Sequence, residues 1–422
     1  MPLDESETGS KNMVRVTIEK IVNGGNGLGR LDDGRAVFAP FVLPGEAVRL
    51  RLGEQKRGYA RGDLLEVLTP HPQRIQPPCE YFGVCGGCHF QQMPYPMQLE
   101  IKREILRDQL LRIGGLDALE IAPVVPSPEE WSYRNHVQFH LTPDGKLGFV
   151  DAKGERVVAV HECRLLKPAL VDLWGRVAFD ADTGLNKVIL RSSNTGDRMI
   201  ILESDDPQPI AFSTDAPVSV VYRGPGGEMV LAGDEAIETG VLGQLFRISA
   251  SAYYPMNDNV ATAMVTQVLE HLALNGNETV IDAYCGAGIF SAFLAERAKA
   301  VIGIESSPAA CADFQVNLDR FGNVALYEAP VENVLPALNV HPDVVVLDPP
   351  RAGLDRKVVD ALGKLSPERL VSISRDAATL ARDARRLAST GFEMKVITPF
   401  DTQPQTQHFE SIVFWEKSRP VE

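Results

Sequence analysis

The most constraining feature of this sequence is a cluster of cysteines, because three of the six in the chain lie in the stretch Cys79-x5-Cys85-x2-Cys88. Two glycines separate the last two thiols and let the backbone fold around a bound group. Cys163 lies downstream and is available as a fourth ligand. The spacing predicts an iron–sulfur cluster, because structural zinc usually shows two close pairs of ligands. Zinc and cysteines without a ligand remain alternatives.

Disulfide bonds are a competing explanation for clustered cysteines. Residues 1–12 are polar and acidic and lack the apolar run of a secretion signal. We therefore expect a cytoplasmic protein with reduced thiols, in which such spacing indicates metal binding or catalysis more often than cross-links. No apolar run has the length of a membrane span, and we expect no membrane partner.

The charge of the chain is unevenly distributed. The 422 residues carry a net charge of −14, which argues against non-specific nucleic-acid binding by the whole surface. Residues 13–76, however, hold ten Lys or Arg against seven Asp or Glu. A mildly basic front end on an acidic body permits a local RNA footprint there.

Short strands and Gly-rich turns between Val14 and Leu68 predict a small five-stranded barrel. Such barrels often present a basic face to nucleic acid, and a purely structural β-domain is the alternative. Residues 95–113 have helical periodicity. The apolar face of this helix would consist of Leu99, Ile105, Leu106 and Leu110.

The rest of the chain divides into two patterns. Alternating strands return between 124 and 240, and the stretch 136–150 is a hairpin candidate. From about residue 244 onward, apolar strands alternate with helix-length stretches. This second pattern predicts a doubly wound α/β sheet, with its last strand, 408–417, at or near one side.

The first strand of that sheet ends in a glycine turn that suits a cofactor. Asp282 precedes the turn, and Gly286 and Gly288 allow a ligand to approach the backbone closely at the start of a helix. Glu305 ends the next strand, where a carboxylate can bind ribose hydroxyls. A dinucleotide site would have a third glycine at Ser291, so the pattern favours an adenosyl ligand with an amino-acid tail. A plain strand-to-helix turn is the alternative.

A later strand ends in Asp348-Pro-Pro-Arg351. The rigid prolines fix the carboxylate as a hydrogen-bond acceptor in the crevice at the carboxyl ends of the strands. Methyltransferases that act on amino groups use a related Asp-Pro-Pro followed by an aromatic residue. Arg351 in that place disfavours this class.

Taken together, these features resemble the S-adenosylmethionine-dependent RNA uracil-5-methyltransferases, over about residues 13–417. The resemblance rests on the barrel, the four cysteines, Tyr133-Arg134-Asn135, the turn at 282–288 and the stretch 347–353. It implies an α/β fold: a doubly wound Rossmann-like methyltransferase domain, an N-terminal TRAM or OB-like β-barrel and a central α+β iron–sulfur domain. RNA, ribosomal or transfer, is the implied partner, and we expect a monomer.

The resemblance also implies domain bounds and site residues. The implied segments are a disordered tail at 1–12, the barrel at 13–72, the cluster domain at 73–93 and 120–243, and the methyltransferase domain at 94–119 and 244–422. The implied ligands of a 4Fe–4S cluster are Cys79, Cys85, Cys88 and Cys163. The implied S-adenosylmethionine site consists of Tyr284, Gly286, Gly288, Glu305 and Asp348. The implied RNA contacts are Arg134 and Asn135.

The chain departs from the family where the chemistry occurs. Family members carry a catalytic cysteine after a serine at the end of a strand, and this chain has Ser374-Arg375-Asp376 there. A pocket glutamine of the family is replaced by Pro255. The proton-abstracting glutamate of the family is retained as Glu410.

Arg375 cannot do the work of a thiolate. C5 of uracil is a poor nucleophile, and the family activates it by thiolate attack at C6. A guanidinium stays protonated and has no lone pair for attack. Three hypotheses stay open: a methyltransferase with a changed target atom, a catalytically inactive RNA-binding relative, and uracil-5 methylation through another thiol, Cys285 or Cys311.

Overall fold

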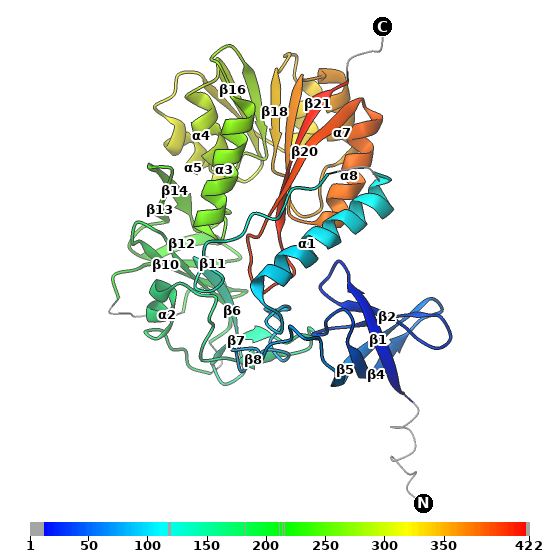
Figure 1. The fold of residues 1–422 in the computed structure, drawn as a ribbon. Helices are drawn as coiled ribbons and strands as arrows, with labels where there is room; N and C mark the ends of the chain where they lie inside the picture. Colours follow the sequence, from blue (N-terminus) through cyan, green and yellow to red (C-terminus); the bar gives the residue numbers. More distant parts are fainter. Residues whose placement is uncertain are drawn as a thin grey trace, which may run out of the picture.

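The computed structural model describes residues 12–116, 120–181, 183–210, 212, 214 and 216–418. These residues form a closed barrel, a mixed sheet from the middle of the chain and a large sheet in the C-terminal part (Figure 1). The tail predicted at 1–12 lies outside the described residues, apart from residue 12. Within the described ranges, no helix is long and apolar enough to cross a membrane.

The N-terminal strands close into a barrel in the order β1-β2-β3-β5-β4. Its strands are β1 (Met13–Ile21), β2 (Gly27–Arg30), β3 (Ala36–Ala39), β4 (Ala47–Gln55) and β5 (Tyr59–Thr69). Alternate residues such as Val16, Ile18, Val48 and Leu50 fill its core. The alternating apolar pattern thus fixes which face of each strand points inward, and the predicted five-stranded barrel is confirmed.

The middle of the chain forms a seven-stranded sheet in the order β12-β11-β10-β9-β6-β7-β8. Its elements are β6 (His136–Leu141), β7 (Leu147–Val150), β8 (Val157–Ala159), α2 (Pro168–Trp174), β9 (Leu185–Ser192), β10 (Arg198–Ser204), β11 (Ser219–Gly224) and β12 (Gly227–Ala232). The antiparallel pairing of β6 with β7 confirms the predicted hairpin. A separate hairpin of β13 (Ala236–Val241) and β14 (Gln244–Ser249) leads to the C-terminal sheet.

The C-terminal part is a doubly wound sheet in the order β17-β16-β15-β18-β19-β21-β20. Its strands are β15 (Thr279–Ala283), β16 (Ala300–Glu305), β17 (Val324–Glu328), β18 (Val344–Leu347), β19 (Arg369–Ser374), β20 (Phe392–Phe400) and β21 (Glu410–Lys417). The helices and helical turns are α3 (Asp258–Leu272), α4 (Ile289–Ala295), α5 (Pro308–Leu318), α6 (Val331–Val334), η2 (Leu335–Ala337), α7 (Arg356–Leu365) and α8 (Ala377–Ser389). The predicted sheet is confirmed, and β21 lies one strand inside the edge, antiparallel to both neighbours.

Helices cover both faces of this sheet, which explains its apolar strands. In β18 all four residues are buried, and their side chains alternate between two clusters. Val344 and Val346 pack with helices α3, α4 and α5, whereas Val345 and Leu347 pack with α7 and α8. Figure 1 shows α3 and α4 on one side of the sheet and α7 and α8 on the other.

The helix that follows the cysteine segment also belongs to this sheet. α1 (Tyr95–Gln109) begins after Pro94 and continues into a π-helical turn, η1 (Leu110–Gly114). It runs beside α8 in Figure 1, and its residues Ile105 and Leu106 join the cluster of α7 and α8. The predicted helix is confirmed. The predicted apolar face is only partly right, because Leu99 is half-buried while two polar side chains of α1 are fully buried.

Those two polar side chains, Gln98 and Lys102, bind a short segment that we call the connecting segment, residues 401–408 between β20 and β21. The Lys102 ammonium donates to Asp401 Oδ1 at 2.6 Å, and both side chains are 0% exposed. Gln98 accepts from the backbone N–H of Gln405 at 2.9 Å and donates to the Gln405 side chain at 2.9 Å. These bonds fix the connecting segment against α1.

The connecting segment also holds the cysteine region and the middle sheet. The backbone N–H groups of His89 and Phe90 both donate to the Gln405 carbonyl, at 2.9 and 3.0 Å. The hydroxyl of Tyr133 donates to the Pro404 carbonyl at 3.0 Å. Three parts of the chain that are distant in sequence therefore meet on one strand connection.

The buried ion pair gives a stability prediction. Lys102→Met should lower the free energy of unfolding by about 3–5 kcal/mol, because it leaves the Asp401 carboxylate buried without its cation. Lys20→Met is the matched control: Lys20 pairs with Asp108 at 2.5 Å but its side chain is 41% exposed, so we expect a loss of about 1 kcal/mol or less. Urea unfolding measures both, and equal losses would contradict the role assigned to the buried pair.

Candidate active site

A cavity of about 460 Å³ opens at the carboxyl ends of β15, β16, β18 and β19. This is where ligands bind in doubly wound sheets, and the volume lies within the range of small-molecule sites. Many of the residues expected at the cofactor or the chemistry line it, namely Tyr284, Cys285, Gly286, Glu305, Asp348, Arg375 and Glu410. The fold thus brings together residues that lie up to 126 positions apart in the sequence.

The glycine turn after β15 is held by the carboxylate at the end of β16. The N–H of Gly286 donates to Glu305 Oε2 at 3.0 Å. The N–H groups of Ser306 and Ser307 both donate to Glu305 Oε1 at 2.7 Å. Backbone donors therefore fix the Glu305 carboxylate in the cavity wall, where it can bind a ligand that lies against the glycine turn.

The turn itself depends on positive backbone angles. Tyr284, Gly286 and Gly288 have φ values of 64°, 55° and 86°. A Cβ at Gly286 would meet nothing within 4 Å, whereas one at Gly288 would lie 2.4 Å from Leu318 and 2.8 Å from Phe314. Gly288 starts α4 and is needed for packing; Gly286 leaves the backbone open towards the cavity.

Asp282 lies beneath the turn instead of in the cavity. It is 1% exposed, and the Ser291 hydroxyl donates to its Oδ2 at 2.6 Å. Burial raises the pKa of Asp282 to about 7, and Asp348 adds to this increase while Ser291 opposes it. Asp282 therefore supports the turn from below. Its hydrogen-bond donor is Ser291, at the position where a dinucleotide-binding site would have its third glycine.

Arg375 occupies the end of β19 and is bound on two sides. Its Nη2 donates to Asp348 Oδ2 at 2.8 Å, and its guanidinium lies over the Tyr253 ring, 4.1 Å from the centroid. Burial opposes the charge, but Asp348 and Tyr253 outweigh it and raise the pKa of Arg375 above its ordinary value. The cation is permanent, and the position where the resemblance led us to expect a catalytic cysteine holds a fixed hydrogen-bond donor.

Glu410 begins β21 and faces Arg375 across the cavity. Burial raises the pKa of Glu410 to about 7, Asp348 adds to the increase, and Arg375 and Arg351 oppose it. A carboxyl with such a pKa can take up and release a proton near neutral pH. Because β21 follows the connecting segment directly, the same contacts that fix Asp401 and Gln405 also position Glu410.

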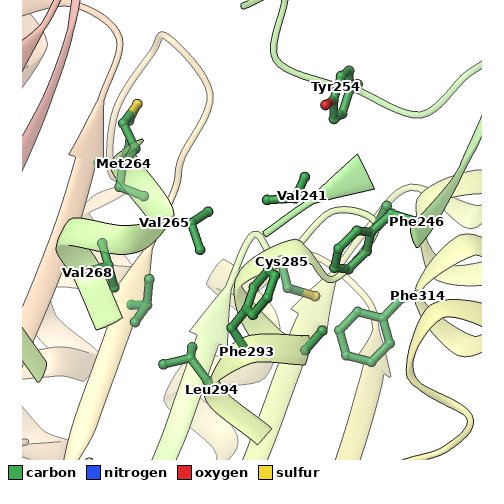
Figure 2. Close-up of a cluster of buried hydrophobic side chains, with 14 of the residues drawn as sticks. Val241, Phe246, Tyr254, Met264, Val265, Val268, Cys285, Phe293, Leu294 and Phe314 are labelled. Atoms are coloured by element: carbon green, nitrogen blue, oxygen red, sulfur yellow. The ribbon is translucent and has the colours of Figure 1, made fainter. Parts of the chain in front are cut away.

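Neither Cys285 nor Cys311 has the surroundings of a nucleophile. Cys285 packs close to Phe293 and Phe314 in the apolar cluster of Figure 2, and burial raises the pKa of its thiol well above the ordinary value. Burial also raises the pKa of Cys311 to about 11, and its thiol donates to the Glu305 carbonyl at 3.5 Å. Thiols with these pKa values are protonated at neutral pH, and protonated thiols are poor nucleophiles.

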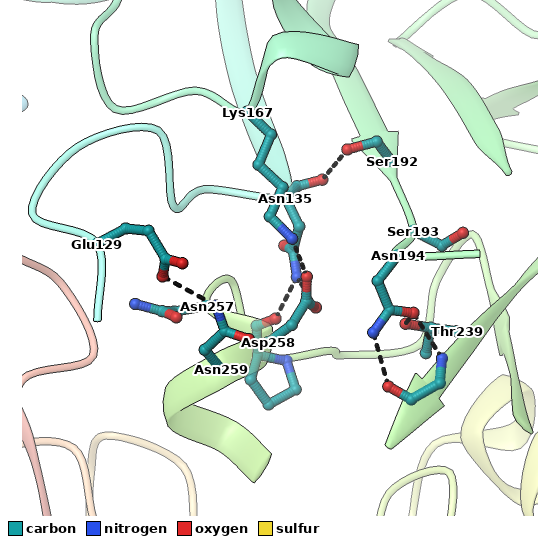
Figure 3. Close-up of polar contacts among 12 residues, drawn as sticks. Glu129, Asn135, Lys167, Ser192, Ser193, Asn194, Thr239, Asn257, Asp258 and Asn259 are labelled. Carbon is teal, nitrogen blue, oxygen red and sulfur yellow. Dashed lines mark hydrogen bonds and ion pairs between the residues drawn. The ribbon is translucent and has the colours of Figure 1, made fainter. Parts of the chain in front are cut away.

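The predicted RNA residue Asn135 is directed into the protein. Its side chain is 2% exposed and donates to the Pro255 carbonyl at 2.8 Å and to Asp258 Oδ1 at 2.6 Å (Figure 3). Lys167 pairs with the same Asp258 carboxylate. Since Tyr253 and Pro255 line the cavity, the geometry favours a role for Asn135 in holding the cavity loop over a direct RNA contact.

The four predicted cluster ligands surround one small cavity. Its lining includes Cys79, Cys85, Cys88, Cys163 and Arg134. Burial raises the pKa of Cys88 to about 12, and the other three thiols contribute to the increase. Among the described residues, no three His, Cys, Asp or Glu are close enough to hold a single metal ion. The four cysteines thus share the lining of one cavity.

A second polar cavity, of about 180 Å³, lies between the barrel and the sheet. Asn23 and Gly24 of the β1–β2 turn form one wall, and Arg351 and Arg375 form part of the other. Because Arg375 also lines the large cavity, its side chain stands between the two. The sequence analysis did not predict the contribution of Asn23 and Gly24 to this cavity or the packing of Tyr253 against Arg375. No local pattern around these residues indicates either contact.

Comparisons with known proteins agree with this arrangement. Residues 215–418 match the profile of the tRNA (uracil-5-)-methyltransferase family, and residues 10–65 match the TRAM domain. An uncharacterised RNA methyltransferase of Halalkalibacterium halodurans is 33% identical over 99% of this chain and 99% of its own length. One from Thermotoga maritima is 30% identical over 94% of this chain and 98% of its own length.

One similar solved structure is the tRNA (uracil-54, C5)-methyltransferase of Pyrococcus abyssi in complex with S-adenosyl-L-homocysteine. Its TM-score with this chain is 0.74 at 24% identity, over 95% of this chain and 100% of that one. At this level of identity the similarity concerns the fold, and it supports the combination of barrel and doubly wound sheet.

The two glycines of the turn give a matched pair of variants. Gly286→Ala should cost about 1–2 kcal/mol of stability, because only the positive φ disfavours a side chain there. Gly288→Ala should cost about 2–5 kcal/mol, because the new methyl group also collides with Leu318 and Phe314. Chemical denaturation measures the difference, and equal losses would mean that close packing does not explain Gly288.

Proposed function

Because the chain belongs to the S-adenosylmethionine-dependent RNA (uracil-5-)methyltransferase family, we propose that it methylates a base in RNA by a route without a thiolate nucleophile. The observation that carries this proposal is Arg375, which stands at the family's nucleophile position and is paired with Asp348 at 2.8 Å. The rest of the site keeps what methyl transfer needs, namely a cofactor-sized cavity and the half-buried Glu410.

The cavity residues fit S-adenosylmethionine, which supplies an electrophilic methyl group when it is bound. The fixed Glu305 carboxylate suits the ribose hydroxyls, and the open backbone at Gly286 suits close contact with a ligand. Tyr284 and Phe290 offer apolar surface in the same wall. Gly288 allows the turn to pack closely against Leu318 and Phe314. Asp348 lines the cavity beside Arg375.

The cysteine cavity fits a 4Fe–4S cluster better than a single ion. Each thiolate of such a cluster binds a different iron atom, so the four sulfurs stand further apart than around one ion. The arrangement of Cys79, Cys85, Cys88 and Cys163 around a space agrees with this geometry. Arg134 in the same wall and the Gly87 N–H, which donates to Cys85 Sγ at 3.4 Å, would stabilise thiolate charge. The cluster would then have a structural role, since four cysteines leave no open iron site.

A catalytically inactive RNA-binding relative is the second candidate. It is favoured by the second cavity, where Arg351 and Arg375 face the barrel turn at Asn23 and Gly24. Fixed arginines beside a nucleic-acid-binding barrel suit phosphate recognition. Both candidates would bind RNA, so a binding assay does not distinguish them. A methyl-transfer assay does, because only the first candidate transfers a methyl group.

The decisive measurement is transfer of labelled methyl from S-adenosylmethionine to RNA from the source organism with this gene deleted. We expect incorporation by the unmodified chain, and a loss of about 10²–10⁴-fold for Glu410→Gln, which removes the base. Glu416→Gln on the same strand, with a side chain 60% exposed, is the control and should keep full activity.

Absence of transfer from a folded chain that binds both S-adenosylhomocysteine and RNA would instead establish the inactive relative. Appearance of 5-methyluridine only in Arg375→Cys would mean that the pocket is intact and lacks only the thiol.

The cluster proposal has its own test. Cys85→Ser should lose the brown absorbance, the iron and the acid-labile sulfide together, and much of the soluble protein. Cys285→Ser, which changes a thiol outside the cysteine cavity, should keep the iron content. Soluble, well-folded and colourless Cys85→Ser with unchanged thermal stability would show that the cluster is dispensable or was never bound.

A further inference from the structure

We propose that the methyl acceptor is the ring nitrogen of a lactam in an RNA base, N3 of uracil or N1 of guanine, and not C5 of uracil. In both bases an N–H group lies beside a carbonyl, so the edge presents a hydrogen-bond donor next to an acceptor. This inference rests on the proposed function, because it names the atom that the proposed methyl transfer modifies.

Arg375 and Glu410 present the complement of such an edge, because a fixed donor and a proton acceptor line one cavity. The ion pair of Arg375 with Asp348 is also incompletely satisfied. Within the described residues, Arg375 Nε is a buried donor without an acceptor, and Asp348 Oδ1 is a buried acceptor without a donor. Buried polar atoms without a partner cost free energy, and functional sites are one of the places where proteins retain them.

Both side chains reach the cavity. Arg375 and Asp348 line it, and their side chains keep 17% and 21% of their surface exposed. A lactam edge entering there offers its carbonyl to the Arg375 guanidinium and its N–H to the Glu410 carboxylate, which lines the same cavity. The fixed cation then stabilises the negative charge that develops on the carbonyl oxygen as the nitrogen loses its proton.

Glu410 supplies the proton acceptor. The charged groups that face it are Asp348 and Arg351 from the loop after β18 and Arg375, which directly follows β19. In the step, the Glu410 carboxylate takes the N–H proton, the nitrogen lone pair forms the bond to the methyl carbon, and the carbon–sulfur bond of the sulfonium donor breaks. The products are an N-methylated base, neutral S-adenosylhomocysteine and a protonated Glu410, so charge and atoms balance.

Other acceptor atoms fit these residues less well. C5 of uracil needs a thiolate at C6, and Arg375 cannot provide one. An exocyclic amine becomes positive when it is methylated, and the permanent cation of Arg375 would oppose that charge. A ribose hydroxyl is a much weaker acid than a lactam N–H, and a carboxylate with a pKa of about 7 is too weak a base for it.

The test identifies the methylated nucleoside. The unmodified chain is incubated with S-adenosylmethionine and RNA from the source organism with this gene deleted, and the digested RNA is analysed by mass spectrometry against N3-methyluridine, N1-methylguanosine and 5-methyluridine. Either N-methylated product supports the inference and says which base is the target. 5-Methyluridine, an exocyclic N-methyl or a ribose methyl overturns the inference and leaves the proposed function standing. No methylated nucleoside overturns both.

Variants of Arg375 test its role independently of the product. Arg375→Met should lower the rate about 10²-fold or more, because it removes the stabilising cation. It should also move the acid limb of the pH–rate profile to higher pH, because Arg375 holds the pKa of Glu410 down. Arg375→Lys keeps the charge and should keep the midpoint near pH 7, at a reduced rate.

Binding of S-adenosylhomocysteine by calorimetry shows whether each variant is folded. Arg356→Met is the matched control, since that arginine side chain is 86% exposed and does not line the cavity. An Arg375→Met variant that binds S-adenosylhomocysteine normally and keeps the rate and pH profile of the unmodified chain would overturn the assigned role.

Discussion

The arrangement of the parts depends on the buried ion pair between Lys102 and Asp401. An ammonium and a carboxylate that are both fully removed from water must satisfy each other, so α1 and the connecting segment can pack in only one register. One helical turn away on α1, two hydrogen bonds between Gln98 and Gln405 fix the same register. The residues that follow the cysteine cluster, His89 and Phe90, are hydrogen-bonded to the same segment through the Gln405 carbonyl. The strand that carries Glu410 begins shortly after the anchored Gln405, so the packing of distant parts determines the position of the proposed catalytic carboxyl.

Much of the fold follows from periodicity in the sequence. Alternating apolar residues such as Val16 and Ile18 specify a barrel wall, and the uninterrupted apolar run of β18 specifies a strand covered on both faces. The edge strand β17 escaped prediction because its residues are mostly exposed and carry little apolar pattern. Leu99 was misplaced for a related reason: the two buried polar residues on α1 are satisfied by Gln405 and Asp401 from a distant part of the chain, and no local pattern indicates these partners.

The candidate site divides in the same way. Gly286, Glu305 and Asp348 could be named because strand ends and turns have local signatures. The replacement at Arg375 was also visible, but its meaning was not, because Asp348 and Tyr253 come from other elements. Asn135 was expected to contact RNA, and its side chain is buried, as is that of Asp282 beneath the turn. A polar residue beside a motif looks the same in the sequence whether it contacts a ligand or supports the loop that does.

The pairing of Arg375 with Asp348 also affects how this site can evolve. Some arginine codons differ from cysteine codons by a single nucleotide, so a cysteine at position 375 can arise by one point mutation. That mutation would leave Asp348 without its cation and uncover the ring of Tyr253. The new cysteine would therefore begin with a destabilised pocket and an unneutralised carboxylate beside it, which disfavours a thiolate. A reactive thiol at this position therefore requires compensating changes at neighbouring positions.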